Sequence, residues 1–490
     1  MFRLWRLLYG VLDVPLFYWT ALRLLRVASV VTPDAPNRIL DWVMQRFAYS
    51  GWPHGHNRGW INIHVSRAVV RLRHALTAPG PPQPRRALTS RPPRRLRIGV
   101  MGQFCRALGF PAALFEEFPR GSANLYVIDF LHLGVGADYA ARPAAAYLPL
   151  DLEQTATYAS EIRRGAACVN GFDLDLLVNT SYRMEAYHLL DAIDTVGAIA
   201  NYCTGCDLLH HDKVDFQLHC QPQADYFFQG DRLFCATTRT LLKPVVLWLH
   251  PYYDRRGIPE SGHAPWSDRQ PLIVFHGSLY KLASAEFLTL IADLMSDDPS
   301  LEFAFMGRND GDALQRIQDV FERRGLGSRI HYEGVFSSVR DAAGMLGDRG
   351  WLRMRELLGR ARFAPDPWPV GGGSSRFEAY AAAVPSISPR LHTDPASWTR
   401  PQMIGSETTD LHVPMGTAVS REDYRALSRR CLYDERYATA LIAQQLAVAR
   451  RLSDGRLWWN SLTECYERWR RGGVEGPMPE ANACAAAYAP

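Results

Sequence analysis

The residues of this chain best suited to chemistry form a glycine-rich turn at positions 371–375. Around it, the stretch 362–388 predicts a short apolar strand, a proline-rich loop, the turn, a helix over 377–383 and a second buried strand from Val384. Backbone N–H groups and the positive end of a helix converge on a bound anion at such a turn. The turn consists of Gly371, Gly372, Gly373, Ser374 and Ser375.

Glu378 lies one helical turn after this loop. Its carboxylate could accept hydrogen bonds from both hydroxyls of a ribose, while Ser374 and Ser375 would add hydroxyl donors at the phosphates. Together these residues favour a nucleoside diphosphate as the ligand. The spacing of Ser375 and Glu378 is also that of a capping box, which satisfies a helix N-terminus without any ligand. Both interpretations are open at this stage.

Length and composition bound the class of protein. A chain of 490 residues predicts two or three domains. With 47% apolar and 21% charged residues, it has the composition of a soluble globular protein. The nine cysteines are odd in number and scattered, which argues against a disulfide framework and indicates a reducing compartment.

Charge is distributed unevenly along the chain. Residues 1–97 carry 16 Arg and 3 Asp, a net charge of +13, which leaves −8 for the rest of a chain whose total is +5. A basic segment attached to an acidic domain is expected to contact an anionic partner. The whole chain has only three lysines, Lys213, Lys243 and Lys281, so each deserves inspection as a functional cation.

The N-terminal region, residues 1–77, is predicted to be helical, basic and aromatic. Its longest uncharged run in the first thirty residues, 14–22, is nine residues long, well short of the ~20 needed to span a bilayer. No cleavage site of a signal peptide follows it. Such helices either lie in a membrane interface or pack on the body of the protein. A Pro- and Arg-rich linker, 78–95, separates this region from the rest.

Residues 96–265 predict a first α/β domain. Helical stretches lie between several apolar strand candidates, which favours a parallel sheet. The candidates are 96–104, 123–133, 173–181, 196–203 and 214–220, and 244–251 is either another strand or the connection out of the domain.

Residues 266–395 predict a second α/β domain, followed by a helical extension over 396–475 and a disordered tail over 476–490. It begins with a strand and loop over 271–282 and continues with helix 283–295, strand 301–307, helix 312–324, strand 329–336 and helix 351–360. Ligands of such sheets bind at the carboxyl ends of the strands. The loops at 277–281, 307, 334–336 and 371–375 are therefore predicted to line one rim, which favours a nucleotide more strongly than the turn alone.

Two Rossmann-like halves with the nucleotide loops in the second resemble the GT-B glycosyltransferases. Three segments resemble the O-GlcNAc transferase family, including its bacterial relatives that glucosylate asparagine. They are 173–218 (DLDLLVNTSYR to KVDFQL), 277–282 (GSLYKL) and 365–388 (PDPWPVGGGSSRFEAYAAAVPSIS). The resemblance implies a GT-B fold with two domains facing a cleft, a UDP-sugar as co-substrate, an inverting mechanism, and neither a metal nor a cofactor.

The resemblance also assigns roles to residues. In it, Lys281 neutralises charge on the departing UDP, which is electrostatic stabilisation of a leaving group. The other donor-site residues are Ser278 in the lysine segment, Val335 and Phe336 at the base, Gly371 to Ser375 at the diphosphate and Glu378 at the ribose. Val335 and Phe336 could equally be core residues, and His276 could touch a phosphate or only pack.

The sequence departs from the family in three respects. It has no tetratricopeptide array. The usual polar residues of the glycine-rich turn are replaced by Gly373, Ser374 and Ser375, and Glu378 stands where an aspartate is usual. These differences leave the sugar and the acceptor open.

The general base is expected to be a histidine, whose side chain titrates near neutral pH. His210 and His211 are the candidates in the first matched segment, with His188 also present, and for each of them a structural role is the commoner one. The donor phosphate or a chain of water molecules could accept the proton instead. Cys203 and Cys206 form a C-x2-C pair without a second tight pair, so no metal site is predicted.

The sequence thus predicts an inverting, metal-independent glycosyltransferase that moves a hexose or N-acetylhexosamine from a UDP-sugar to a protein side chain or a glycan or lipid acceptor. One alternative is a UDP-sugar epimerase of the same fold. Another is a non-catalytic, membrane-associated scaffold that binds nucleotide sugars. No nucleic-acid partner is expected, and the predicted location is the cytoplasm, with peripheral contact to the inner face of the membrane.

Overall fold

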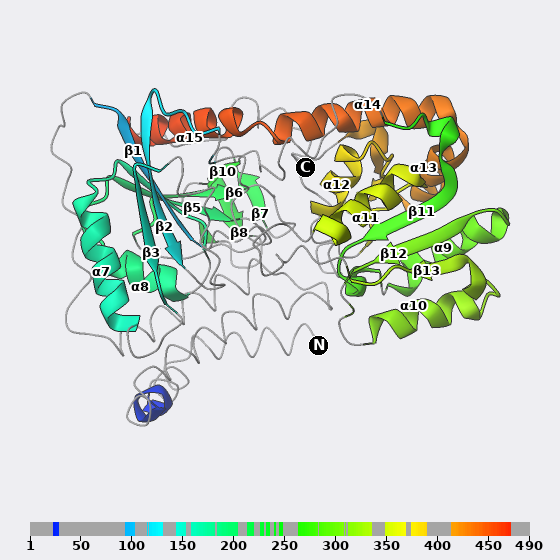
Figure 1. Cartoon of the computed structure of the whole chain (residues 1–490), viewed down its shortest axis with the longest axis horizontal. Coiled ribbons are helices and arrows are strands. Elements are labelled where there is room, and N and C mark those ends of the chain that lie inside the picture. The colour runs from blue at the N-terminus through cyan, green and yellow to red at the C-terminus, as the bar shows by residue number, and fades with distance from the viewer. Residues whose placement is uncertain are drawn as a thin grey trace.

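The structure is a computed structural model of the 490-residue chain. It describes residues 23–28, 94–102, 115, 117–130, 144–152, 158–181, 184–203, 213–219, 226–229, 232–235, 240–241, 245–247, 263–282, 284–307, 309, 312–335, 348–368, 374–389 and 413–471. Two parallel sheets flanked by helices form two α/β domains (Figure 1). The predicted α/β class is confirmed.

The N-terminal domain contains a seven-stranded parallel sheet in the order β10-β6-β5-β4-β1-β2-β3. Its central strands are almost continuously apolar and buried, as expected for a parallel sheet covered on both faces. The strands are β1 (Leu96–Gly102), β2 (Ala123–Phe130), β3 (Ala146–Leu150), β4 (Leu176–Asn179), β5 (Ala198–Cys203), β6 (Phe216–His219) and β10 (Val245–Leu247).

Edge strand β3 was not predicted. It contains Pro149, which cannot donate to a ladder and makes the segment a poor strand by sequence. β3 pairs with β2 alone, at the edge of the sheet, where a proline is tolerated. Segment 244–251, left open between strand and connection, does contain a strand, because β10 pairs in parallel with β6.

Helices cover the two faces of this sheet with separate apolar clusters. Helices α7 (Tyr158–Gly171) and α8 (Met184–Ala192) pack on one face. The other face, which includes Ile98 and Val100 of β1, is covered by α15 (Gly455–Arg470) through Trp458 and Trp459. The last described helix of the chain therefore completes the core of the first sheet.

The C-terminal domain contains a four-stranded parallel sheet in the order β13-β12-β11-β14. Apolar clusters lie on both of its faces. Its strands are β11 (Gln270–His276), β12 (Glu302–Met306), β13 (Ile330–Tyr332) and β14 (Ala361–Phe363), and its helices are α9 (Ala285–Asp297), α10 (Ala313–Glu322), α11 (Asp348–Arg360) and α12 (Ser374–Ala381).

Several boundaries in this domain differ from the prediction, and two of them lie at or after the glycine-rich turn. Helix α12 begins at Ser374, three residues before the predicted start. The predicted strand from Val384 is reduced to β15 (Ser388–Pro389), which pairs with β16 (Thr417–Ala418). The residues before β15 still run beside the end of β14, since the N–H of Ala364 donates to Pro385 O at 3.0 Å.

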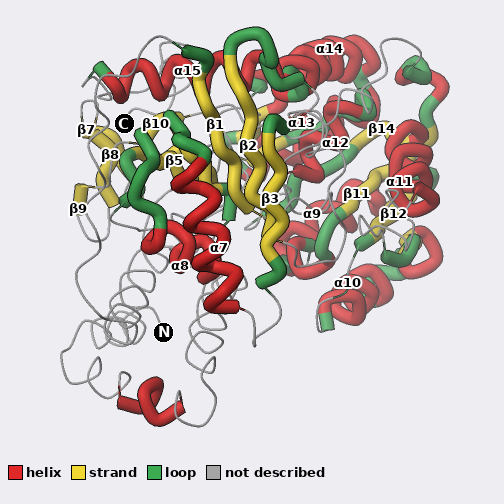
Figure 2. The backbone as a smooth tube through the Cα atoms, turned by 60° about the vertical axis from the view of Figure 1, so that its left-hand side comes forward, coloured by secondary structure: helices red, strands yellow, loops and turns green. Residues whose placement is uncertain are grey.

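The C-terminal helices connect the two domains. Helices α13 (Arg421–Tyr433) and α14 (Glu435–Leu452) pack on the second domain, and α15 continues to the first, so that α14 and α15 follow one another along one side of the molecule (Figures 1 and 2). Asp454 starts α15, because its carboxylate accepts from the N–H of Arg456 at 3.0 Å and of Leu457 at 3.2 Å.

The remaining described elements are short, and one of them is the helical segment 23–28. The others are the antiparallel strands β7 (Tyr226–Gln229), β8 (Arg232–Cys235) and β9 (Thr240–Leu241), and the 3-10 helices η3 (Trp266–Asp268), η4 (Leu279–Lys281), η5 (Gly327–Arg329) and η8 (Pro414–Gly416).

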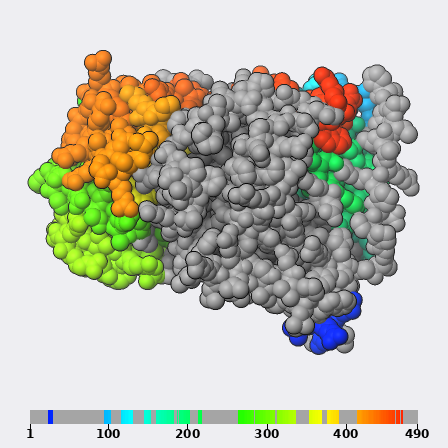
Figure 3. All heavy atoms as spheres, turned by 180° about the vertical axis from the view of Figure 1, so that it is seen from behind, coloured from blue at the N-terminus to red at the C-terminus, as the bar shows by residue number. Residues whose placement is uncertain are grey.

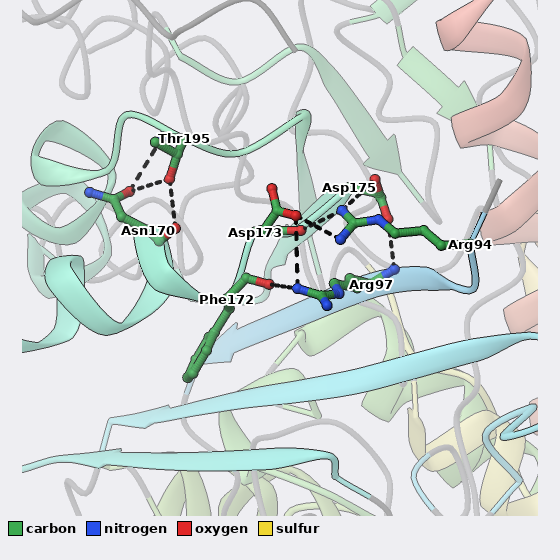
Figure 4. A network of polar contacts seen from close by, with 7 residues as sticks. All are labelled: Arg94, Arg97, Asn170, Phe172, Asp173, Asp175 and Thr195. Carbon is green, nitrogen blue, oxygen red and sulfur yellow. Dashed lines mark hydrogen bonds and ion pairs between the residues drawn. The ribbon is translucent and has the colours of Figure 1, made fainter. Parts of the chain in front are cut away.

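An ion-pair network ties the end of the predicted linker to the amino edge of the first sheet (Figure 4). Arg94 lies 2.6 Å from a carboxylate oxygen of Asp173 and 3.4 Å from one of Asp175. The other oxygen of Asp175 accepts from the N–H of Arg97 at 2.8 Å, and Arg97 Nη1 donates to Phe172 O at 3.0 Å. These residues lie where β1 and β4 begin, opposite the edge at which ligands bind, so the network is structural.

Candidate functional site

Three strands of the C-terminal sheet end at glycines that lie close together. Gly277, Gly307 and Gly334 follow β11, β12 and β13, with φ of +141°, +146° and +83°. The N–H of Gly277 donates to Met306 O at 3.0 Å, and the N–H of Gly307 donates to Gly334 O at 2.9 Å. A Cβ on Gly307 would lie 1.7 Å from Gly277 O. Only glycine allows the close approach at Gly307, so at these strand ends the chain offers backbone groups to the edge.

The first turn of α12 meets the same edge. A Cβ placed on Gly277 would lie 3.1 Å from Ser375 Oγ. The N–H groups of a first helical turn have no partner within the helix and favour negative charge. Gly371, Gly372 and Gly373 lie outside the described residues, and Ser374 is the first residue of α12. Ser375 is therefore within the helix rather than at its N-cap, and the capping-box interpretation is wrong.

A buried ion pair holds the segment on both sides of the turn. Arg376 Nη1 lies 3.1 Å from Asp366 Oδ2, and the two side chains are 2% and 0% exposed. Arg376 Nη1 also donates to Ser388 Oγ at 2.5 Å. The turn is thus bracketed by two residues fixed in the core. The sequence analysis missed both, although charged residues within so apolar a stretch were a usable signal.

Aromatic side chains support the same segment. The ring of Trp368 makes edge-to-face contacts with Phe287 and Tyr424, with centroids 5.0 and 4.9 Å apart. Burial raises the pKa of Tyr424 well above its ordinary value, so that its hydroxyl stays protonated. That hydroxyl donates to Asp366 O at 3.1 Å, which adds a second restraint before the turn.

Glu378 is bonded to His276 across the sheet edge. His276 Nε2 and Glu378 Oε2 are 2.6 Å apart. His276 is the last residue of β11 and is buried, whereas the Glu378 side chain is 15% exposed. His276 is thus bonded to the carboxylate predicted for the ribose, and its contact with a phosphate stays a prediction.

Lys281 and Ser278 lie in the loop that leaves β11. Lys281 ends the short helix η4, and its N–H donates to Ser278 O at 3.1 Å. Leu279 and Leu282 anchor this turn because both are fully buried, whereas Ser278 and Lys281 are half-buried. The loop thus presents Lys281 from a fixed backbone near the strand end.

Val335 follows Gly334 and is 61% exposed. The alternative that it is a core residue is wrong, and an exposed valine beside the other loops suits contact with a flat ring. Phe336, His210 and His211 lie outside the described residues. His188 is buried on α8.

Lys213, the second lysine described, is structural. Its buried Nζ donates to Leu190 O at 3.0 Å and to Asp191 O and Ile193 O at 2.6 Å each. It thereby caps the C-terminal end of α8, where a cation is favoured.

The carboxyl edge of the N-terminal sheet is polar as well. Asn179 at the end of β4 donates through Nδ2 to Asn201 Oδ1 at 2.7 Å and to Ser181 O at 2.8 Å. Both asparagines are buried. Within the described part of the chain, no group of three or more His, Cys, Asp and Glu side chains is placed to hold a metal ion.

No family model matches the sequence, and no curated protein matches it. Solved structures do share the fold. One is an O-GlcNAc transferase of Thermobaculum terrenum, solved as a mutant, with a TM-score of 0.61 and 17% identity over 96% of this chain and 82% of that one. Another is the apo form of the lipopolysaccharide outer core galactosyltransferase WaaB, with a TM-score of 0.50 and 11% identity over 76% of this chain and 100% of that one. The chain has the GT-B fold. The fold expected from the sequence resemblance is confirmed.

No described helix is both long and apolar enough to cross a membrane.

Proposed function

We propose that this chain is a glycosyltransferase whose C-terminal domain binds a nucleotide sugar. The observation that carries the proposal is the convergence at one sheet edge of three strand-end glycines, the first turn of α12 and the Glu378 carboxylate. Such an edge offers backbone donors to phosphate and an acceptor to ribose. The GT-B fold supports the same conclusion, because ligands of open α/β sheets bind at this edge.

The donor is proposed to be a UDP-sugar that carries a hexose or an N-acetylhexosamine. The turn Gly371 to Ser375 and the start of α12 would hold the diphosphate. Glu378 would accept from the ribose hydroxyls, and Val335 with Phe336 would contact the base. Ser278 would lie beside the diphosphate in the loop that carries Lys281.

The reaction is proposed to invert the anomeric centre without a metal or a cofactor. An acceptor O–H or N–H attacks the anomeric carbon, the bond from that carbon to the diphosphate oxygen breaks, and its electron pair leaves with UDP. Lys281 and the N–H groups of α12 would stabilise the negative charge on the leaving group. The acceptor proton would pass to His210 or His211.

The proposed acceptor is a protein side chain or a glycan or lipid.

The proposed location is the cytoplasmic face of a membrane, and helix 23–28 supports membrane association. Leu24 and Val27 are 66% and 65% exposed, share a helix face and alternate with the exposed Arg23 and Arg26. The segment, coloured blue in Figure 3, lies at the surface of the molecule. Exposed apolar and basic residues on one helix suit an anionic lipid surface. Flotation with phosphatidylserine vesicles tests this, because Leu24→Ser with Val27→Ser should reduce binding. Equal flotation of both proteins would contradict it.

The experiment that tests the function is a turnover assay. The chain is incubated with a panel of UDP- and GDP-sugars, with and without peptide, glycan and lipid acceptors, and both UDP release and the recovered sugar are measured. A transferase releases UDP in proportion to the glycosylated acceptor. Conversion of one UDP-sugar into its epimer without an acceptor would instead establish the epimerase alternative, and binding without turnover would establish the scaffold.

A further inference from the structure

The contact between His276 and Glu378 joins two elements that are far apart in the chain. The two residues are separated by 102 positions, and Nε2 lies 2.6 Å from Oε2. Their side chains are 4% and 15% exposed, so water competes little for this bond. Among the described residues, His276 is the side chain bonded to this carboxylate.

The chemistry of the pair fixes the direction of the hydrogen bond. An ionised carboxylate only accepts, so with Glu378 ionised the hydrogen bond runs from Nε2–H of His276 to Oε2 of Glu378. Hydrogen bonds to charged acceptors are short and strong, in agreement with the distance.

Both partners are held by rigid backbone. His276 ends the buried strand β11 in register with Met306 of β12, and the following N–H, of Gly277, donates to Met306 O. Glu378 lies on α12 two residues after Arg376, whose guanidinium is fixed by the ion pair with Asp366. A carboxylate bonded between two such elements has little rotamer freedom left to lose when a ligand binds.

We propose that His276 is a positioning residue for nucleotide recognition. By holding Oε2 of Glu378, it directs the remaining acceptor sites of that carboxylate toward the ribose, and the pair sets the preference for a ribonucleotide over a 2′-deoxyribonucleotide. This inference rests on the proposed function.

A purely structural role predicts something different. If the pair only ties β11 to α12, its loss weakens the binding of every nucleotide to the same extent. If it positions the ribose acceptor, its loss weakens the binding of UDP more than that of 2′-deoxy-UDP. The ratio of the two affinities therefore separates the two roles.

The test is calorimetric titration of the full chain with UDP and with 2′-deoxy-UDP. His276→Leu removes the donor at similar volume, and His276→Gln keeps an amide N–H close to the position of Nε2. We expect His276→Leu to lower the UDP to 2′-deoxy-UDP affinity ratio by about tenfold, equivalent to about 1.4 kcal/mol, with little change for 2′-deoxy-UDP. His276→Gln should recover most of the ratio.

A second variant covers the case in which His276→Leu does not fold. Glu378→Asp keeps the charge but withdraws it from His276, and should lower the ratio to a similar extent. An unchanged ratio in either folded variant would overturn the inference while leaving the proposed function intact. Absence of UDP binding to the native chain would overturn both.

Discussion

The buried ion pair between Asp366 and Arg376 offers the sharpest test of how the glycine-rich turn is held. Arg376→Met removes the cation and leaves the Asp366 carboxylate in a site where its side chain is 0% exposed. Removing one partner of a buried pair costs about 3–5 kcal/mol, because the remaining buried charge loses the compensation that this partner supplied. For a domain of this size, that corresponds to a fall of roughly 6–20 °C in the unfolding midpoint.

The double variant Asp366→Leu with Arg376→Met is the matched control. It removes both charges, so it should be more stable than Arg376→Met by about 2 kcal/mol or more, which is the signature of a coupled pair. Tryptophan fluorescence during urea unfolding is a suitable assay, because the ring of Trp368 packs on Phe287 and Tyr424 in this domain. Arg376→Met should also weaken UDP binding, since the turn loses one of its fixed ends.

Two results would refute this reasoning. A cost below about 1 kcal/mol for Arg376→Met would be typical of an exposed ion pair rather than a buried one. A double variant whose loss equals the sum of the two single losses would show that the two charges are not coupled.

Three further predictions concern the glycine that follows β12, the lysine that caps α8 and the thermal stability of the chain at acid pH. In a thermal melt, Gly307→Ala should destabilise the C-terminal domain by several kcal/mol. Gly325 is also at positive φ (+69°) but has open space around it, so Gly325→Ala should cost only about 1–2 kcal/mol. Equal losses would contradict the close approach of Gly307 to Gly277. Lys213→Met should destabilise the N-terminal domain by about 2–3 kcal/mol but leave the calorimetric UDP affinity unchanged; a weaker affinity would contradict its structural role. Burial opposes ionisation of Asp298, but hydrogen bonds from Ser300 and Tyr433 outweigh it and hold its pKa below the ordinary value, so its stabilising contribution is present above about pH 4 and is lost as the pH falls further. Melting midpoints from pH 6 to pH 3 should accordingly fall more steeply for the native chain than for Tyr433→Phe, and parallel curves would contradict the assignment.

Much of the fold could be predicted because its signals are local. The apolar runs of β1, β4, β11 and β12 and the glycines after the strands are readable one segment at a time, and the parallel order follows from the helices between them. The strand β3 was missed because Pro149 weakens its local signal.

Contacts between distant segments could not be predicted in the same way. Glu378 was singled out from its spacing, but its partner His276 lies 102 residues away and is defined only once β11 and α12 are placed together. The pairing of Asp366 with Arg376 likewise depends on how the chain folds back around the turn. The sequence predicted a single helical extension at the C-terminal end. In the structure the helix breaks at Ser453 and Asp454, and α15 packs on the sheet of the other domain.

The central claim is that the edge around Gly277, Lys281 and α12 binds a nucleotide diphosphate without a metal ion. Calorimetric titration of UDP in EDTA, with native chain, Lys281→Ala and Lys213→Met side by side, tests it most directly. The account predicts that UDP binds the native chain and Lys213→Met equally in EDTA and that Lys281→Ala binds at least tenfold more weakly. Absence of UDP binding to the native chain, or an affinity that Lys281→Ala leaves unchanged, would contradict it.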